Sequence, residues 1–398
     1  MSFTSLGPAH AYFSQIDIMK FAILGGGIGG LTLAVALQRK NIDVTVYEAA
    51  PQWKPLGAGL GLAGNAVKAF REIGIEQEVL REGKVLMKVA IRNPRGKVLT
   101  SVDSEEISRR FGVVNNFAIH RADLHHVLIG QLRPNTVHLN KSCVDFNQND
   151  NGVTITFSDG STAHADYMIA ADGIHSVARR KLLSDVKTRY AGYTCWRGVT
   201  DELPMDFNPD ETSETWGRGI RLGIVPLTKG RVYWFACVNA SPNDPMMRSL
   251  TPAELLAFFG DFHAPIPDLI KRTKKIIWND IIDLEPITKF AFGRVVLMGD
   301  AAHATTPNMG QGACMAIEDA AVLANLIERY ENAGDAFKVF EEKRIRRTTK
   351  VVNDSWQIGR MAQWDNPLMS SLRNIAISLV PKSVTNNQFK FIYDVSLK

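Results

Sequence analysis

Three glycines near the start of the chain have the spacing of a phosphate-binding turn. In the segment KFAILGGGIGG, residues 20–30, Gly25, Gly27 and Gly30 fit the pattern GxGxxG. The first glycine allows a tight turn, the second lets the backbone approach a pyrophosphate, and the third lets a helix pack closely on a strand. A helix predicted from Ile28 would direct its free N–H groups and positive dipole end at the phosphates. The segment therefore predicts a dinucleotide site.

A carboxylate follows at the distance that ribose recognition requires. Glu48 lies 18 residues beyond Gly30, at the end of a predicted strand, Asp43–Glu48. At that position a carboxylate can accept hydrogen bonds from the hydroxyls of a ribose. These residues alone do not distinguish NAD from FAD.

A second strand–loop–helix segment lies far downstream, at residues 294–320 (RVVLMGDAAHATTPNMGQGACMAIEDA). Asp300 follows a strand and a glycine, so its carboxylate is expected to face solvent or a ligand, or to form an N-cap or Asx turn. The sequence GQG, residues 310–312, precedes a helix predicted over Ala313–Arg329. The N-terminus of that helix would stabilise an electron-rich group such as the reduced pyrimidine ring of a flavin. Together the two segments predict loops that hold opposite ends of one FAD.

The elements predicted around these motifs alternate between strands and helices. Buried strands are predicted at Lys20–Leu24, Tyr167–Ala171 and Arg294–Met298, helices at Ile28–Arg39, Asn65–Gly74 and His120–Gln131, and a hairpin around VTITFSD (153–159). From Leu183 to Glu285, aromatic strand-like runs alternate with proline-bearing loops. This pattern predicts a second, mostly antiparallel sheet.

The predicted fold class is α/β. It comprises a discontinuous Rossmann-like FAD-binding domain, a second, mostly antiparallel β-sheet domain for the substrate, and C-terminal helices. The expected boundaries are 1–18 for an extension, 19–182 and 286–345 for the two parts of the FAD-binding domain, 183–285 for the substrate domain, and 346–398 for a C-terminal helical segment.

Composition excludes several classes of protein. The 398 residues are 45% hydrophobic and 22% charged, with a formal charge of +5, which indicates a globular protein and gives no nucleic-acid signature. The four cysteines lack CxxC spacing, so neither a disulfide framework nor a zinc site is expected. No apolar run reaches the ~18 residues of a transmembrane helix, and residues 1–18 lack the pattern of a signal peptide, so a cytoplasmic location is expected.

Two further segments receive ordinary structural interpretations. The charged run EEKRIRR, Glu341–Arg347, is interpreted as the solvated face of a helix. The short apolar stretch Asn374–Val380 is interpreted as a core or dimer-packing helix in preference to a membrane anchor.

The chain resembles the single-component, class A FAD-dependent aromatic monooxygenases of the p-hydroxybenzoate hydroxylase-like fold, near the branch of urate hydroxylases, salicylate hydroxylases and zeaxanthin epoxidases. Three motifs carry the resemblance in the family's order. They are GGGIGG with Glu48, ADGIHSVARR at Ala171–Arg180, and LMGDAAHATTPNMGQGACMAIEDA. The resemblance covers nearly everything from Met19 to about Arg347.

The resemblance implies a set of FAD contacts along the chain. Those implied are Gly25, Gly27, Ile28, Gly30 and Glu48 for the ADP half, Arg121, Cys143 near adenine, Asp172 and Gly173, Asp300 at the ribityl chain, and Gly310, Gln311, Gly312 and Ala313 around the flavin ring.

It also implies two residues of the substrate site. Arg221 and Tyr233 fall on the positions of the substrate arginine and active-site tyrosine of urate hydroxylases. The alternatives are a surface strand arginine and a core aromatic. Asn308 replaces the aspartate of those enzymes, which argues against urate itself.

Other side chains of the same segments have less direct interpretations. His303 could act in acid–base chemistry, although packing within its loop is the preferred interpretation. Trp196 and Trp216 are interpreted as core or pocket wall.

The implied activity is hydroxylation of a small aromatic, heteroaromatic or polycyclic substrate with O2 and NADH or NADPH, through a flavin C4a-hydroperoxide. The alternatives are epoxidation of an apolar alkene, a flavin-dependent reductase or halogenase without oxygen insertion, and a non-catalytic flavin-binding module. No metal is expected, and the chain is expected to be a monomer or a homodimer.

Overall fold

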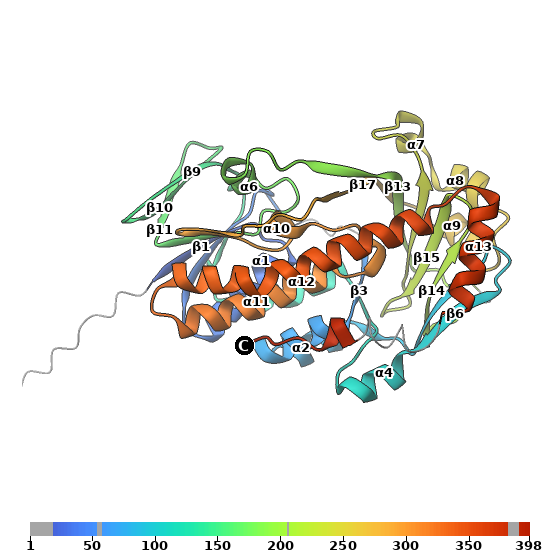
Figure 1. The fold of residues 1–398 in the computed structure, drawn as a ribbon, viewed down its shortest axis with the longest axis horizontal. Helices are drawn as coiled ribbons and strands as arrows, with labels where there is room; N and C mark the ends of the chain where they lie inside the picture. Colours follow the sequence, from blue (N-terminus) through green and yellow to red (C-terminus); the bar gives the residue numbers. More distant parts are fainter. Residues whose placement is uncertain (1–18, 54–57, 205–206, 381–389) are drawn as a thin grey trace, which may run out of the picture.

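The computed structural model describes residues 19–53, 58–204, 207–380 and 390–398. The predicted extension 1–18 lies outside the described residues. Figure 1 shows an elongated molecule with one group of strands and helices at each end and a long helix, α12 (Ala333–Ala362), running between them.

A six-stranded sheet with the order β18-β19-β12-β1-β2-β8 forms the centre of the first group. Its strands are β1 (Lys20–Leu24), β2 (Asp43–Tyr47), β8 (Val137–His138), β12 (Tyr167–Ala170), β18 (Ala291–Phe292) and β19 (Val295–Leu297). All neighbours are parallel except β18 and β19. Because β1 is buried along four of its five residues, it reads as a continuous apolar run, as the sequence predicted.

Helices α1 (Ile28–Arg39) and α11 (Gly312–Arg329) pack on each other beside this sheet. The predicted helix 28–39 is confirmed. The second predicted segment also folds as expected, because β19 lies beside β12 in the same sheet as β1. The six-stranded sheet of the predicted FAD-binding domain is therefore built from parts of the chain that lie far apart in sequence.

Smaller elements surround the six-stranded sheet. Two three-stranded sheets have the orders β3-β7-β4, from β3 (Gly59–Leu62), β4 (Lys84–Val85) and β7 (Phe117–His120), and β11-β10-β9, from β9 (Cys143–Asn149), β10 (Gly152–Phe157) and β11 (Thr162–Ala165). The helices here are α2 (Gly64–Ile73), α3 (Glu76–Glu82), α4 (Ser104–Phe111), α5 (Arg121–Gly130) and α6 (Val177–Leu182). The hairpin predicted around residues 153–159 is confirmed by the antiparallel pairing of β10 with β9 and β11.

The second group is built on a seven-stranded sheet with the order β17-β13-β16-β15-β14-β5-β6. Its strands are β5 (Lys88–Arg92), β6 (Val98–Asp103), β13 (Thr188–Thr200), β14 (Glu211–Trp216), β15 (Ile220–Pro226), β16 (Val232–Asn239) and β17 (Ile276–Leu284). Only β14 and β5 are parallel neighbours. The predicted mostly antiparallel sheet is thus present. It also includes β5 and β6, which come from within residues 19–182, so the chain enters this sheet before the proposed boundary at 183.

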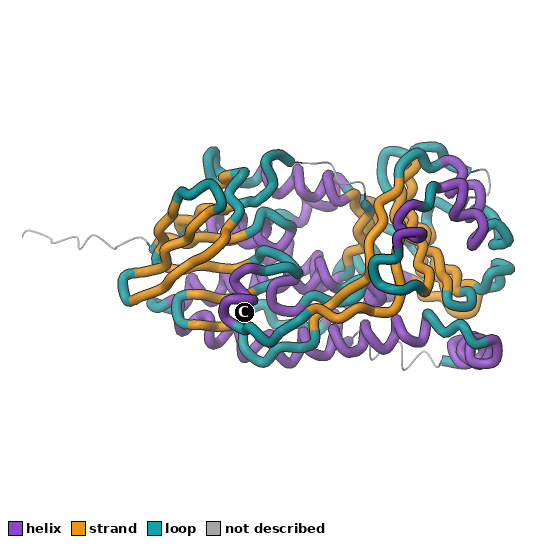
Figure 2. The backbone as a smooth tube through the Cα atoms, turned by 90° about the horizontal axis from the view of Figure 1, so that it is seen from above, coloured by secondary structure: helices purple, strands orange, loops and turns teal. Residues whose placement is uncertain are grey.

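One face of the seven-stranded sheet is covered by short helices, α7 (Pro245–Ser249), α8 (Pro252–Phe259) and α9 (Ile266–Arg272), which lie outside the sheet in Figure 2. Trp196 and Trp234 are fully buried there against side chains of α8 and α9. Trp216 is also buried, beside Ala362 and Ile377. Both tryptophans named in the sequence analysis therefore belong to the core.

The C-terminal helices correct part of two predictions. Arg344, within the run interpreted as a solvated face, is 1% exposed, because it forms ion pairs with buried acids of α11. The core alternative for Asn374–Val380 is wrong, since the end of α13 (Pro367–Ser378) and the residues after it leave Ile375, Leu379 and Val380 exposed. Dimer packing by this segment stays a prediction. Within the described ranges, no helix combines the length and the apolar character that crossing a membrane requires.

Candidate cofactor and substrate sites

The three glycines of the first loop have three different surroundings. Gly25 adopts φ +100°, and a Cβ added there would lie 2.4 Å from the carbonyl oxygen of Ala171. A Cβ on Gly30 would lie 2.1 Å from the carbonyl oxygen of Gly25. Around Gly27, by contrast, no heavy atom lies within 4 Å of an added Cβ. The folded chain therefore requires glycine at Gly25 and Gly30, because a side chain there would meet the backbone. The free space at Gly27 instead fits a ligand that approaches the start of α1 closely.

Glu48 holds this loop in place. Its Oε2 accepts a hydrogen bond from the backbone N–H of Gly26 at 2.6 Å, and its Oε1 accepts one from Ala50 at 2.8 Å. His125 adds a contact of 2.8 Å between Nε2 and the carbonyl oxygen of Gly26. A carboxylate can accept about four hydrogen bonds, so Glu48 retains capacity for a ribose.

Asp300 opens the second loop. It follows Gly299 (φ +57°) as the first residue of α10 (Asp300–His303), and its side chain caps no helix. The carboxyl is exposed, and it makes no hydrogen bond with the residues that the structure describes. The alternative of an N-cap or Asx turn is therefore wrong. Although Asp300 keeps accessible surface, the protein atoms packed around it desolvate its carboxyl and raise its pKa, while His303, Arg121 and Arg179 act in the opposite direction.

The fold thus brings Asp300 close to residues from two distant segments. Arg121 is the first residue of α5, is exposed, and has no hydrogen-bond or ion-pair partner among the described side chains. Arg179 of α6 is buried and donates from Nη1 to the carbonyl oxygen of Ala301 at 3.0 Å. The Arg179 guanidinium therefore links the segment Ala171–Arg180 to the second loop.

Asp172 has a structural role that the sequence analysis did not foresee. Its Oδ2 accepts a hydrogen bond of 2.8 Å from the backbone N–H of Val177 at the start of α6. Its Oδ1 is buried and has no partner. Gly173 beside it adopts φ +77°, with no atom within 4 Å of an added Cβ. Cys143 lies near enough that Asp172, after burial, contributes to raising the pKa of its thiol to about 11.

The start of α11 completes the cofactor site. Pro307–Met309 forms a short 3-10 helix, η1, and Gly310 follows it with φ +63°. Gln311 is buried at the N-cap of α11, and Gly312 and Ala313 are partly exposed in its first turn. The free N–H groups of this turn can stabilise a partly negative ring.

These residues fit FAD. The space at Gly27, the unpartnered Oδ1 of Asp172 and the unbonded carboxylate of Asp300 all call for a polar ligand that the protein does not itself supply. His303 is excluded from this group. It is 4% exposed, and its Nε2 lies 2.7 Å from Oδ2 of Asp319, which confirms the packing interpretation.

A second surface faces the cofactor domain. Strand register places on one face of the seven-stranded sheet Cys195, Arg197 and Val199 of β13, Arg221, Gly223 and Val225 of β15, and Tyr233, Phe235 and Cys237 of β16. The Tyr233 ring on this face packs against Gly59 of β3, where an added Cβ would lie 2.6 Å from the ring. Tyr193, at the end of the same face, donates its hydroxyl to Asn308 Oδ1 at 3.0 Å. This face therefore borders the loop that leads to α11.

Arg221 is 2% exposed, so the alternative of a surface arginine is wrong. Its guanidinium donates to Glu214 Oε1 at 2.7 Å and to Gln363 Oε1 at 3.1 Å, and it also donates to Asn308 Oδ1. A further contact of 3.3 Å reaches the Tyr193 hydroxyl. Protein groups thus occupy most of its five N–H donors. Asn308 is equally occupied, because its Nδ2 donates to Thr306 and Ser355 at 2.8 Å each.

Tyr233 is 7% exposed and packs in an apolar cluster with Leu86 and Leu227, which agrees with the core-aromatic alternative. Partly exposed side chains on its face include Arg197, Val199 and Phe235. Arg197 donates to Asn279 Oδ1 from β17. The sequence analysis did not single out Arg197, although a lone cation within the aromatic strand YTCWRGV is a usable signal.

Comparisons with known proteins agree with this geometry. A family model described as FAD binding domain matches residues 19–355. The chain is 40% identical over 346 residues to the aurachin C monooxygenase/isomerase of Stigmatella aurantiaca, covering 86% of this chain and 90% of that protein. It is 33% identical over 370 residues to the 2-heptyl-3-hydroxy-4(1H)-quinolone synthase of Pseudomonas aeruginosa, covering 92% of this chain and 95% of that protein.

A solved structure from Klebsiella pneumoniae, in complex with FAD and uric acid, has the same fold. The TM-score is 0.89 at 29% sequence identity, with 96% of this chain and 98% of that chain covered.

Proposed function

The chain belongs to the family described as FAD binding domain and is an FAD-dependent monooxygenase. We propose that it transfers one atom of O2 to a bicyclic heteroaromatic substrate of the 4-quinolone type. NADH or NADPH is the proposed electron donor. The cytoplasm is the proposed location, and a monomer or a homodimer the proposed state.

The partly exposed residues on the sheet face that borders α11 carry this proposal. Phe235 offers an aromatic surface, and its ring centroid lies 6.1 Å from that of Tyr233. Arg197 supplies a cation that can face one carbonyl or enolate oxygen. A flat, mainly apolar substrate with one polar edge matches this combination.

The occupied donors of Arg221 argue against a substrate that needs a strong carboxylate clamp. Glu214 already neutralises this arginine, and breaking a buried ion pair to bind a substrate would leave a charge without its partner. One relative supports this proposal, since it is named for a product that carries a 4-quinolone ring and a heptyl chain.

The protein's own part in the reaction is to bind, orient and exclude water. FAD, when bound, supplies electron transfer and oxygen activation. The first glycine loop and Glu48 would hold its ADP half, and Asp300 and the start of α11 would hold its flavin half. The apolar side chains of the sheet face would keep water from the reacting atoms.

The test is steady-state oxidation of NADH and NADPH under air with a panel of 4-quinolones, urate and salicylate. A 4-quinolone should stimulate oxidation most and yield a product heavier by one oxygen atom. A preference for salicylate would contradict the proposed substrate class. Oxidation without any oxygenated product would favour the reductase alternative.

A further inference from the structure

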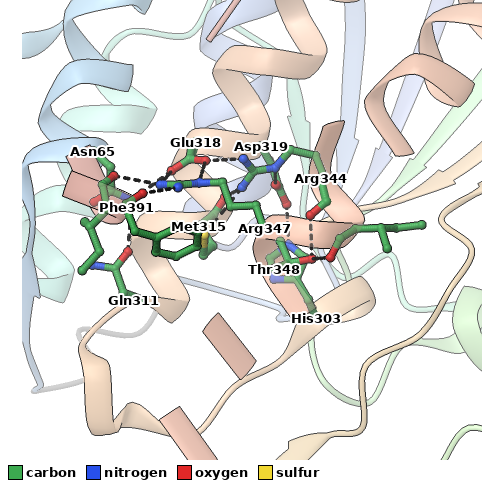
Figure 3. Close-up of polar contacts among 12 residues, drawn as sticks. Asn65, His303, Gln311, Met315, Glu318, Asp319, Arg344, Arg347, Thr348 and Phe391 are labelled. Carbon is green, nitrogen blue, oxygen red and sulfur yellow. Dashed lines mark hydrogen bonds and ion pairs between the residues drawn. The ribbon is translucent and has the colours of Figure 1, made fainter. Parts of the chain in front are cut away.

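A buried ionic cluster lies behind the start of α11. Figure 3 shows Glu318 and Asp319 of α11 pointing toward Arg344 and Arg347 of α12. Both acids are fully buried. Arg344 Nε lies 2.6 Å from Asp319 Oδ1, and Arg347 Nε lies 2.5 Å from Glu318 Oε1. Burial alone would raise the pKa of Glu318, but Arg344 and Arg347 hold it lowered, so Glu318 is a carboxylate and can only accept hydrogen bonds.

This acceptor fixes the direction of two amide groups. Asn65 Nδ2 donates to Glu318 Oε2 at 3.0 Å, so the NH2 group of Asn65 must face α11. The same Nδ2 lies 3.0 Å from Gln311 Oε1. Since a donor faces it, the side of Gln311 turned to Asn65 must be its oxygen. The NH2 group of Gln311 therefore points away from Asn65, and it has no partner among the residues that the structure describes.

The C-terminal residues anchor this chain of contacts. Arg347 donates to the carbonyl oxygen of Phe391 at 2.6 Å and to that of Ile392 at 2.8 Å. These bonds orient the guanidinium that in turn holds Glu318. The relay runs without a break from Arg347 through Glu318 and Asn65 to Gln311.

We propose that this relay, Arg347–Glu318–Asn65–Gln311, sets the polarity of Gln311 so that its NH2 group donates a hydrogen bond to bound FAD at the start of α11. The inference rests on the proposed function, because it takes the flavin half of FAD to lie at that helix. Gln311 contacts the cofactor, and Glu318 and Arg347 are positioning residues. A donor beside the helix N-terminus favours the electron-rich, reduced flavin.

The first test compares two identical substitutions on one helix. In Glu318→Gln, the new amide presents a donor to Asn65, so Asn65 must turn its oxygen toward it and Gln311 must turn its NH2 away from FAD. FAD should bind up to roughly tenfold more weakly, as loss of one hydrogen bond implies. Glu328→Gln is the matched control, because Glu328 lies at the far end of α11, its side chain is 55% exposed, and within the described part of the chain it pairs only with Lys40. This control should bind FAD as the wild type does.

The second test keeps the relay intact and changes only its end. Gln311→Glu retains an oxygen for Asn65 and replaces the donor by a carboxylate oxygen. The reduction potential of the FAD-saturated protein should become more negative in both Glu318→Gln and Gln311→Glu, and should not change in Glu328→Gln. A purely structural role would not shift this potential.

Wild-type affinity and potential in both test variants would overturn the inference. If Glu318→Gln does not fold, an unchanged affinity and potential in Gln311→Glu overturn the inference alone, because the relay would then end on a residue that does not contact FAD. A wild-type protein that binds no FAD would overturn the proposed function instead, so the two failures are distinguishable.

Discussion

Gly27 is a position where a substitution should affect FAD binding without affecting folding. The structure predicts that Gly27→Ala folds as stably as the wild type and binds FAD much more weakly. A Cβ at this position meets no heavy atom within 4 Å, and the backbone angles, φ −73° and ψ −179°, are allowed for alanine. The free protein therefore has no steric reason to reject the methyl group.

The expected change in stability can be worked out from two opposing effects. Alanine is a poorer helix N-cap than glycine by about 0.5–1 kcal/mol. It also reduces the entropy of the unfolded chain, which stabilises by about 0.4–1 kcal/mol. These contributions nearly cancel. In the bound state the methyl group would occupy the space through which a pyrophosphate approaches, and losing one charge-assisted hydrogen bond corresponds to a roughly tenfold to hundredfold weaker affinity.

The assay pairs thermal unfolding of the FAD-free protein with a fluorescence titration of FAD. Gly30→Ala is the control with the opposite pattern, since its Cβ would lie 2.1 Å from the carbonyl oxygen of Gly25. It should lower the stability of the FAD-free protein by about 1–3 kcal/mol. If Gly27→Ala binds FAD as tightly as the wild type, the space at Gly27 is not the phosphate path and the reasoning fails.

Three further predictions concern the other charged residues. Asp300→Asn should weaken FAD binding. The pKa of Asp300 is raised in the free protein, and FAD hydroxyls would favour its ionised form, so the affinity of the wild type for FAD should fall as the pH drops through that pKa. FAD titrations of the variant at the same pH values should show no such fall. Arg221→Met should lower the free energy of unfolding by roughly 3 kcal/mol, since it leaves Glu214 without its partner. In urea denaturation, the double variant with Glu214→Gln should lose less of this free energy than Arg221→Met alone. Arg197→Met should raise the KM for a 4-quinolone roughly tenfold with unchanged FAD affinity, and an unchanged KM would remove Arg197 from the proposed substrate site.

Local patterns in the sequence were sufficient for the elements around the cofactor. The apolar run Lys20–Leu24, the glycines after it and the helix Ile28–Arg39 are each determined by contacts within a short stretch of chain, and the structure has them at the predicted residues. The helix predicted from Ala313 begins one residue earlier, at Gly312. These elements contain most of the predicted FAD contacts.

Long-range pairings were not predictable in the same way. Arg344 was interpreted as solvated because its own helix is highly charged, and only the packing of α12 on α11 shows that it neutralises Glu318 and Asp319. Asp172 was expected to contact FAD, and the additional cap that it forms on α6 depends on the turn between them. The inclusion of β5 in the seven-stranded sheet depends on its parallel pairing with β14, more than 100 residues later in the chain.

The most direct test of the account is an experimental structure of the protein with FAD bound. The adenosine ribose should lie within hydrogen-bonding distance of Glu48, the ribityl chain beside Asp300, and the flavin ring at the start of α11, near Gly310 and Gln311. A flavin ring bound away from this helix, or an FAD molecule in the reverse orientation with adenine at Gln311, would contradict the assignment of the two loops to opposite ends of one cofactor.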